Sequence, residues 1–141
     1  MELIKRLDIV PVPKPRMTRA DVWKHPPRPA VQRYRDYKDE MRLIFSPEEL
    51  PENYLLVFFV PMSRSWSKKK KKEYFHQPHL ATPDKDNLEK AFLDALYSNF
   101  DGNENTNDSH HYDGRVIKVW DFEGHIDVYS LPCILSDILA N

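Results

Sequence analysis

The stretch PDKDNLEKAFLDAL, residues 83–96, carries the clearest structural and chemical signal in this chain. Its apolar residues recur at spacings of three and four, which predicts an amphipathic helix from about Asp86 to Ser98. Two carboxylates, Asp84 and Asp86, stand one residue apart at its start, and Lys90 follows Asp86 by four positions. The side chains that we expect this helix to bury are those of Leu88, Phe92, Ala95 and Leu96.

Paired carboxylates that converge suit a hard cation such as Mg²⁺, which prefers oxygen ligands. A lysine nearby neutralises charge that develops on a phosphate in a transition state. The first functional hypothesis is therefore metal-assisted hydrolysis of a phosphodiester.

A structural alternative explains the same acids. The pattern Asp86-x-x-Glu89 has the layout of an N-terminal capping box, and acidic residues near a helix start are favoured by the helix dipole. Asp86 and Lys90, four residues apart, also match an ordinary surface ion pair. One cap, however, needs one aspartate, and Asp84 is then left without a structural role.

The rest of the chain predicts one small α+β domain over residues 1–141, with helices packed on a mixed sheet in the order β-α-β-α-α-β-β. A polar loop over residues 99–112 and a C-terminal tail over 131–141, with a short helix, complete it. The predicted strands are residues 2–10, 54–60, 115–120 and 125–129, the last two joined by a turn at Glu123-Gly124. The other predicted helices are residues 30–45 and a short one that Ser67 caps.

Charge is distributed unevenly along the chain. Residues 1–80 contain 17 Lys and Arg against 10 Asp and Glu, whereas residues 81–141 contain 4 against 12. The halves carry +7 and −8, which gives the net charge of −1. This asymmetry suits a polyanion-binding surface beside an acidic site, although uneven charge also arises by chance in small domains.

Two basic segments are candidate phosphate contacts. A proline-rich arm over residues 14–29 contains Lys14, Arg16 and Arg19, and its Trp23 offers a stacking surface. The second segment is an uninterrupted run of five lysines. Lysine contacts of this kind give sequence-independent, salt-sensitive affinity for nucleic acid. The lysines of the run are Lys68, Lys69, Lys70, Lys71 and Lys72.

Several function classes are disfavoured. The longest apolar run, Tyr54 to Met62, is too short for a membrane span, and the N-terminus lacks the layout of a signal peptide. Cys133 is the single cysteine, so we expect no disulfide and a cytoplasmic location. The segment 101–107 resembles a calcium loop but has Thr106 where the glycine is required. The adjacent pair His110-His111 makes a poor chelate.

Four segments together resemble the RusA-like family of Holliday junction resolvases, small endodeoxyribonucleases common in bacterial genomes and prophages. The most specific is PDKDNLEK at residues 83–90, followed by LDAL at 93–96. The others are PKPRMTR at 13–19, PMS at 61–63 with WSKKK at 66–70, and DGRV at 113–116.

The resemblance implies that Asp84, Asp86 and Asp113 ligate one or two Mg²⁺ ions per subunit, with Mn²⁺ able to substitute. It implies that Lys90 acts on the scissile phosphate. It further implies a homodimer that nicks opposed strands of branched DNA at a four-way junction in recombination and repair, without a nucleotide cofactor. Where the family has two adjacent aspartates, this chain has Tyr112 before Asp113. Asp108 therefore stays open as a substitute third ligand.

A second hypothesis from a different class is a non-catalytic DNA-binding or architectural protein whose acids serve only as helix caps and turn residues. A calcium-responsive interaction module, resting on the segment 101–107, is a third. The first of these alternatives predicts DNA binding without any metal-dependent product.

Overall fold

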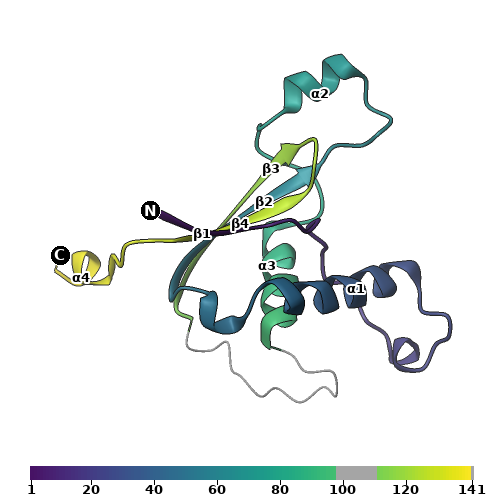
Figure 1. Ribbon diagram of the computed structural model, residues 1–141, viewed down its shortest axis with the longest axis horizontal. Coiled ribbons are helices and arrows are strands. Elements are labelled where there is room, and N and C mark those ends of the chain that lie inside the picture. Colours follow the sequence, from purple (N-terminus) through teal and green to yellow (C-terminus); the bar gives the residue numbers. More distant parts are fainter. Residues whose placement is uncertain (98–110, 141) are drawn as a thin grey trace.

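A computed structural model describes residues 1–97 and 111–140. It contains one mixed sheet of four strands with helices against it, and the predicted order β-α-β-α-α-β-β is confirmed (Figure 1). The strands are β1 (Glu2–Leu7), β2 (Asn53–Pro61), β3 (Asp113–Asp121) and β4 (His125–Ser130). The helices are α1 (Pro29–Ile44), α2 (Lys68–Tyr74), α3 (Lys85–Tyr97) and α4 (Leu135–Leu139), with short 3-10 turns η1 (Arg19–Val22) and η2 (Pro47–Glu49).

The sheet has the strand order β1-β4-β2-β3. Strand β2 is parallel to β3, with Tyr54 opposite Gly114, and antiparallel to β4, which in turn pairs antiparallel with β1. The predicted turn between β3 and β4 is present, but the two strands do not pair with each other because β2 lies between them. The interior position of β2 suits its apolar residues, because a strand with a neighbour on each side is shielded from water.

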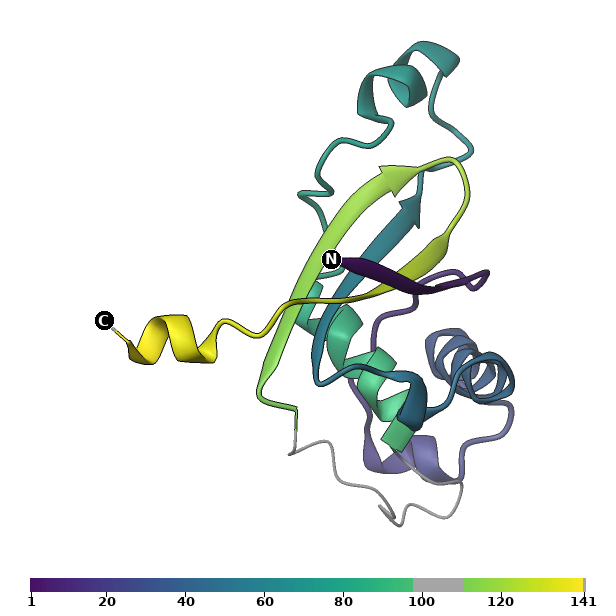
Figure 2. The same cartoon turned by 60° about the vertical axis from the view of Figure 1, so that its left-hand side comes forward.

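The core lies between the sheet and helices α1 and α3, which cover the same face (Figures 1 and 2). Alternate residues of β2 point into it, and Phe58 meets Phe92 of α3 with ring centroids 6.4 Å apart. Burying a side chain of this size stabilises the fold by about 1.5–3 kcal/mol. The predicted buried face of α3 is confirmed at Leu88, Phe92, Ala95 and Leu96.

Helix α1 begins at a proline, which suits the first helical position because the missing N–H has no intrahelical partner there. Spacings of three and four predict an apolar stripe of Tyr34, Tyr37, Met41 and Ile44. The first three are buried, together with Val31, whereas Ile44 is half-buried. Ser67 caps α2 as expected, since its Oγ accepts a hydrogen bond from the Lys70 N–H at 3.1 Å. Within the described ranges, no helix combines the length and the apolar composition that crossing a membrane requires.

The basic arm over residues 14–29 contains local structure as well as its proline-rich stretches. It contains the turn η1, and Asp21 within this turn is 2% exposed. The Arg28 guanidinium donates to both carboxylate oxygens of Asp21, at 2.9 and 2.8 Å. These bonds, with those from Thr18, hold the pKa of Asp21 well below its usual range. The arm therefore carries its basic residues on a fixed loop.

Candidate active site

The backbone that leads into α3 is anchored by strand β3. The Lys118 ammonium group donates to the carbonyl oxygens of Ala81 at 2.6 Å and Pro83 at 2.7 Å. Helix α3 then begins at Lys85, and the Asp84 carbonyl accepts from the Leu88 N–H at 3.2 Å. Asp84 therefore occupies the position before the first helical residue, and Asp86 lies in the first turn.

The capping box that the sequence permits is not formed. Asp86 lies inside the helix, and Glu89 accepts a hydrogen bond from the Tyr54 hydroxyl at 2.8 Å, so it does not reach back to the helix start. Asp86 and Lys90 do not form the surface ion pair either. Toward the described residues, the exposed carboxylates of Asp84 and Asp86 make no hydrogen bond or ion pair. Both acids are therefore available to a ligand.

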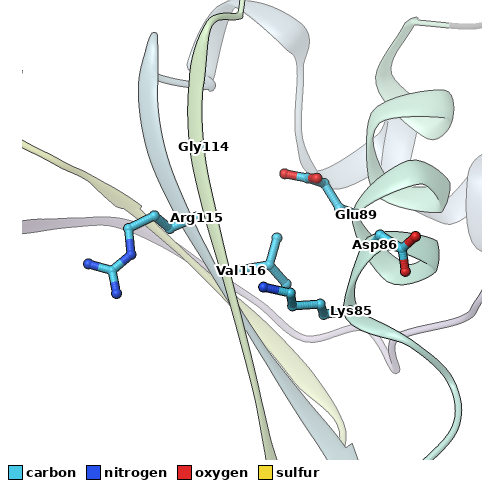
Figure 3. Close-up of a pocket in the computed structure, with 6 residues that line it drawn as sticks. All are labelled: Lys85, Asp86, Glu89, Gly114, Arg115 and Val116. Atoms are coloured by element: carbon cyan, nitrogen blue, oxygen red, sulfur yellow. The ribbon is translucent and has the colours of Figure 1, made fainter. Parts of the chain in front are cut away.

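A cavity of about 250 Å³ lies between the start of α3 and the start of β3. Figure 3 shows Glu89 pointing toward the β3 backbone, whereas the Arg115 guanidinium points away from α3. The Lys85 ammonium also extends toward β3, whereas the Asp86 carboxylate points to the side away from β3. Its lining residues are Lys85, Asp86, Glu89, Gly114, Arg115 and Val116.

The cavity depends on a glycine at its strand side. A Cβ atom added to Gly114 would lie 2.4 to 2.7 Å from two ring carbons and the hydroxyl oxygen of Tyr54. Any side chain there displaces the ring that carries the hydroxyl to Glu89. Because Gly114 has no side chain, the Tyr54 side chain of β2 can pass beside β3 and orient the Glu89 carboxylate of α3.

Lys90 faces a different cavity, of about 540 Å³, between α3 and the basic arm. The Asn87 side-chain amide donates to the Lys14 carbonyl at 3.2 Å, which fixes the arm beside the helix. The Lys14 ammonium forms an ion pair with Asp94 at 2.6 Å, so this predicted DNA contact is tied to α3. The residues that line the cavity are Lys14, Pro15, Arg16, Met17, Asn87 and Lys90.

The other predicted DNA contacts lie in two places. Arg16 and Arg19 are exposed on the arm. The lysine run forms most of α2, which lies beyond the end of β2 and β3 on the opposite side from α1 (Figures 1 and 2). Lys71 is half-buried, and the run's other four lysines are exposed. Both basic segments precede α3 along the chain and lie in different parts of the fold.

Asp113 is separated from the other two predicted ligands. It opens β3 opposite Asn53, and Gly114 next to it faces the Tyr54 ring on the α3 side. Because successive strand residues point to opposite faces, Asp113 is directed to the face away from α3. Among residues 1–97 and 111–140, no three Asp, Glu, His or Cys side chains gather closely enough to hold a metal. Asp108 and the segment 101–107 lie outside the described residues.

Sequence reasoning missed the residues that position this site. Tyr54 reads only as part of an apolar strand, Glu89 as half of a capping box, and Lys118 as a strand residue. The one available signal was Gly114, a glycine directly before the predicted strand 115–120, because a glycine at a strand often marks a close approach of another group. Asn87 was quoted within the motif but had no assigned role.

Comparison with known proteins gives one family. The family model described as Endodeoxyribonuclease RusA matches residues 8–129, which include both acids at the α3 start, Lys90 and Asp113. No curated protein and no solved structure matches the chain.

Proposed function

Because this chain belongs to the endodeoxyribonuclease RusA family, we propose that it is a Mg²⁺-dependent endonuclease that resolves four-way DNA junctions by paired nicks. The observation that carries this proposal is the start of α3, where the exposed carboxylates of Asp84 and Asp86 are free of partners among the described residues. Lys90 stands one helical turn further along. We propose that it serves DNA recombination and repair in the cytoplasm.

The donor set at α3 fits a hard cation in chemistry and accessibility. Asp84 and Asp86 would hold one or two Mg²⁺ ions through carboxylate oxygens, and Mn²⁺ would substitute. Asp113 is the proposed third ligand, with Asp108 as the substitute. When bound, the metal polarises the scissile phosphodiester and lowers the pKa of a coordinated water.

The chain's own residues bind and orient the DNA. The Lys90 ammonium, at the mouth of the cavity beside Arg16, offsets negative charge on the phosphate under attack. Arg16 and Arg19 on the arm and the lysines of α2 contact backbone phosphates, which position the DNA without reading its sequence. Lys118 fixes the backbone before Asp84, so the two carboxylates are presented in one arrangement.

We also propose a homodimer, because two opposed nicks need two active sites. The C-terminal tail supports an association surface, since it extends away from the sheet in Figures 1 and 2 and exposes apolar side chains. These side chains are Ile134, Leu135, Ile138 and Leu139. Sedimentation equilibrium across a range of protein concentrations tests the dimer.

The test uses a labelled synthetic four-way junction and a linear duplex of the same sequence, each with and without Mg²⁺. We expect paired nicks in the junction only, and only with the metal. Asp86→Asn should abolish cleavage while junction binding is retained or strengthened, because a negative charge beside DNA is removed. Asp39→Asn, an exposed aspartate of α1, is the matched control and should cut normally.

The outcomes separate the two classes of function. Binding of the junction without any product under every metal condition supports the non-catalytic DNA-binding protein. Normal cleavage by Asp86→Asn shows that the acids at the α3 start are not the catalytic ones.

A further inference from the structure

An aromatic cluster next to the lysine run has no role in the proposed cleavage. Trp66, Tyr74 and Trp120 meet with ring centroids 4.9 to 6.4 Å apart. They form one wall of a cavity of about 340 Å³, which also contains Lys70. Its remaining lining residues are Pro78, Leu80 and Ala81. We call this cavity the aromatic pocket.

We propose that the aromatic pocket binds an unpaired nucleobase of the DNA strand that enters the candidate active site; this inference rests on the proposed function. Aromatic side chains beside a basic surface are the usual means of holding single-stranded nucleic acid, because every base has a π-face that stacks on them. The volume lies at the lower end of the range for small-molecule pockets, which suits a single base.

The positive charge of Lys70 lies beside the aromatic rings, where it can bind a phosphate. The Lys70 ammonium lies 4.1 Å from the centroid of the Trp66 ring, which is a cation–π distance. Four further lysines follow or precede it on α2. A nucleotide suits both features, because its base stacks on the rings while its phosphate forms an ionic contact with Lys70. A second copy of this chain fits less well, because it would bring two lysine runs together.

The pocket is open and its floor is rigid, as a binding site requires. Tyr74 is 40% exposed and Leu80 is 90% exposed, and Trp66 and Trp120 are half-buried. Together they form an exposed apolar patch, which is a common mark of a binding site. The segment 76–79 lies along the outer edge of β3, where it makes three backbone hydrogen bonds of 2.9 to 3.0 Å. His79, which is 1% exposed, supports the Trp120 ring from behind at 4.2 Å.

The aromatic pocket is continuous with the start of α3. Ala81 lines the pocket, and its carbonyl accepts from the same Lys118 ammonium that holds Pro83. Two residues lie between Ala81 and Asp84, so their Cα atoms are at most roughly 11 Å apart, a span of a few nucleotides along one strand. A strand cut at the acids therefore has its neighbouring bases within reach of the rings.

The test compares two single strands that differ only in their bases. The double variant Trp23→Phe, Asp86→Asn leaves Trp66 and Trp120 as the fluorophores and removes the proposed catalysis. It is titrated without divalent metal with oligothymidylate and with an abasic strand of equal length. We expect fluorescence quenching by the thymidylate alone and an affinity about 5- to 100-fold higher than for the abasic strand. The salt dependence of both should be the same, because both strands present the same phosphates.

A variant then assigns the preference to the pocket. Tyr74→Ala should lower the affinity for thymidylate toward that for the abasic strand and leave the abasic strand unchanged. Leu43→Ala, an exposed apolar residue of α1, is the matched control and should retain the preference. Thermal unfolding confirms that each variant is folded. Equal affinity of the Trp23→Phe, Asp86→Asn protein for the two strands overturns the proposal, and it is the result expected if the pocket holds a peptide side chain instead.

The two proposals fail separately. If the protein prefers thymidylate but never cuts a four-way junction, the nucleobase proposal stands and the nuclease proposal is contradicted. A chain that cuts the junction but binds both strands equally keeps the nuclease and loses the pocket.

Discussion

The Lys118 ammonium lies 2.7 Å from the Pro83 carbonyl oxygen, so a side chain of β3 fixes the residue that precedes the first candidate ligand. The same group holds the Ala81 carbonyl at 2.6 Å, and both bonds bridge positions more than 30 residues apart in sequence. Because the carboxylates themselves have no partner among the described residues, their placement depends on the backbone that carries them. Lys118 is therefore a positioning residue for the proposed reaction.

Lys118→Met keeps the length of the side chain and removes its charge and hydrogen bonds. We expect junction cleavage to fall by about 10- to 100-fold, as is typical when a group that orients a metal ligand is removed. Binding of the intact junction should change little. Single-turnover cleavage and a gel-shift titration measure the two separately, and Lys118→Arg should recover part of the rate. An unchanged cleavage rate in Lys118→Met would show that the segment needs no such anchor.

Gly114→Ala tests the close approach of Tyr54. Its Cβ would meet the Tyr54 ring at 2.4 to 2.7 Å, so the ring must shift and its bond to Glu89 must break. We expect the free energy of unfolding to fall by about 1–3 kcal/mol, the usual cost of overpacking, in urea denaturation. In a Tyr54→Leu background the same substitution should cost less, because the obstructing ring is gone. Equal costs in both backgrounds contradict this account.

Asp113 and Asp108 are distinguished by a paired substitution. We propose Asp113 as the third ligand because the segment DGRV at 113–116 resembles the family motif, although β3 directs Asp113 away from α3. We expect Asp113→Asn to lose cleavage by about 100-fold or more at saturating Mg²⁺ and Asp108→Asn to cut at close to the normal rate. The reverse ranking would assign the third position to Asp108.

The elements that the sequence predicted well are those set by local pattern. Helix α3 follows from the spacing of Leu88, Phe92 and Leu96, and its start at Lys85 lies one residue before the predicted one. Strand pairing was not predictable in the same way, because β2 is parallel to β3 and separates it from β4 through contacts distant in sequence. A short turn between two predicted strands indicates that they pair as a hairpin. In this fold β2, whose apolar residues are buried in the core, lies between β3 and β4 instead.

The residues of the candidate site fall into the same two groups, those visible in a local pattern and those that meet only through contacts distant in sequence. Asp84, Asp86 and Lys90 are visible in sequence because they are neighbours in one motif. Tyr54 and Glu89 are 35 positions apart and meet only across Gly114. Such positioning contacts depend on strand register, which a single sequence does not specify.

His79 makes the stability of the fold depend on pH. Burial, and then the charge of Lys118, lower its pKa in the folded protein below the ordinary histidine value of 6.5. The unfolded chain therefore takes up a proton near pH 6.5 that the folded chain does not. Below that pH, proton uptake stabilises the unfolded chain relative to the folded one. The free energy of unfolding should therefore fall with pH until His79 is also protonated in the folded protein.

Urea denaturation from pH 8 to pH 5 of the wild type and of His79→Phe measures this contribution. Phenylalanine keeps a ring against Trp120 but does not titrate, so we expect a shallower loss of stability on the acid side of pH 6.5. The difference between the two curves isolates His79 from the other histidines. Lys118→Met should also reduce the loss, since it removes the second cause of the lowered pKa. Parallel curves for wild type and His79→Phe would mean that His79 titrates alike in the folded and unfolded chains.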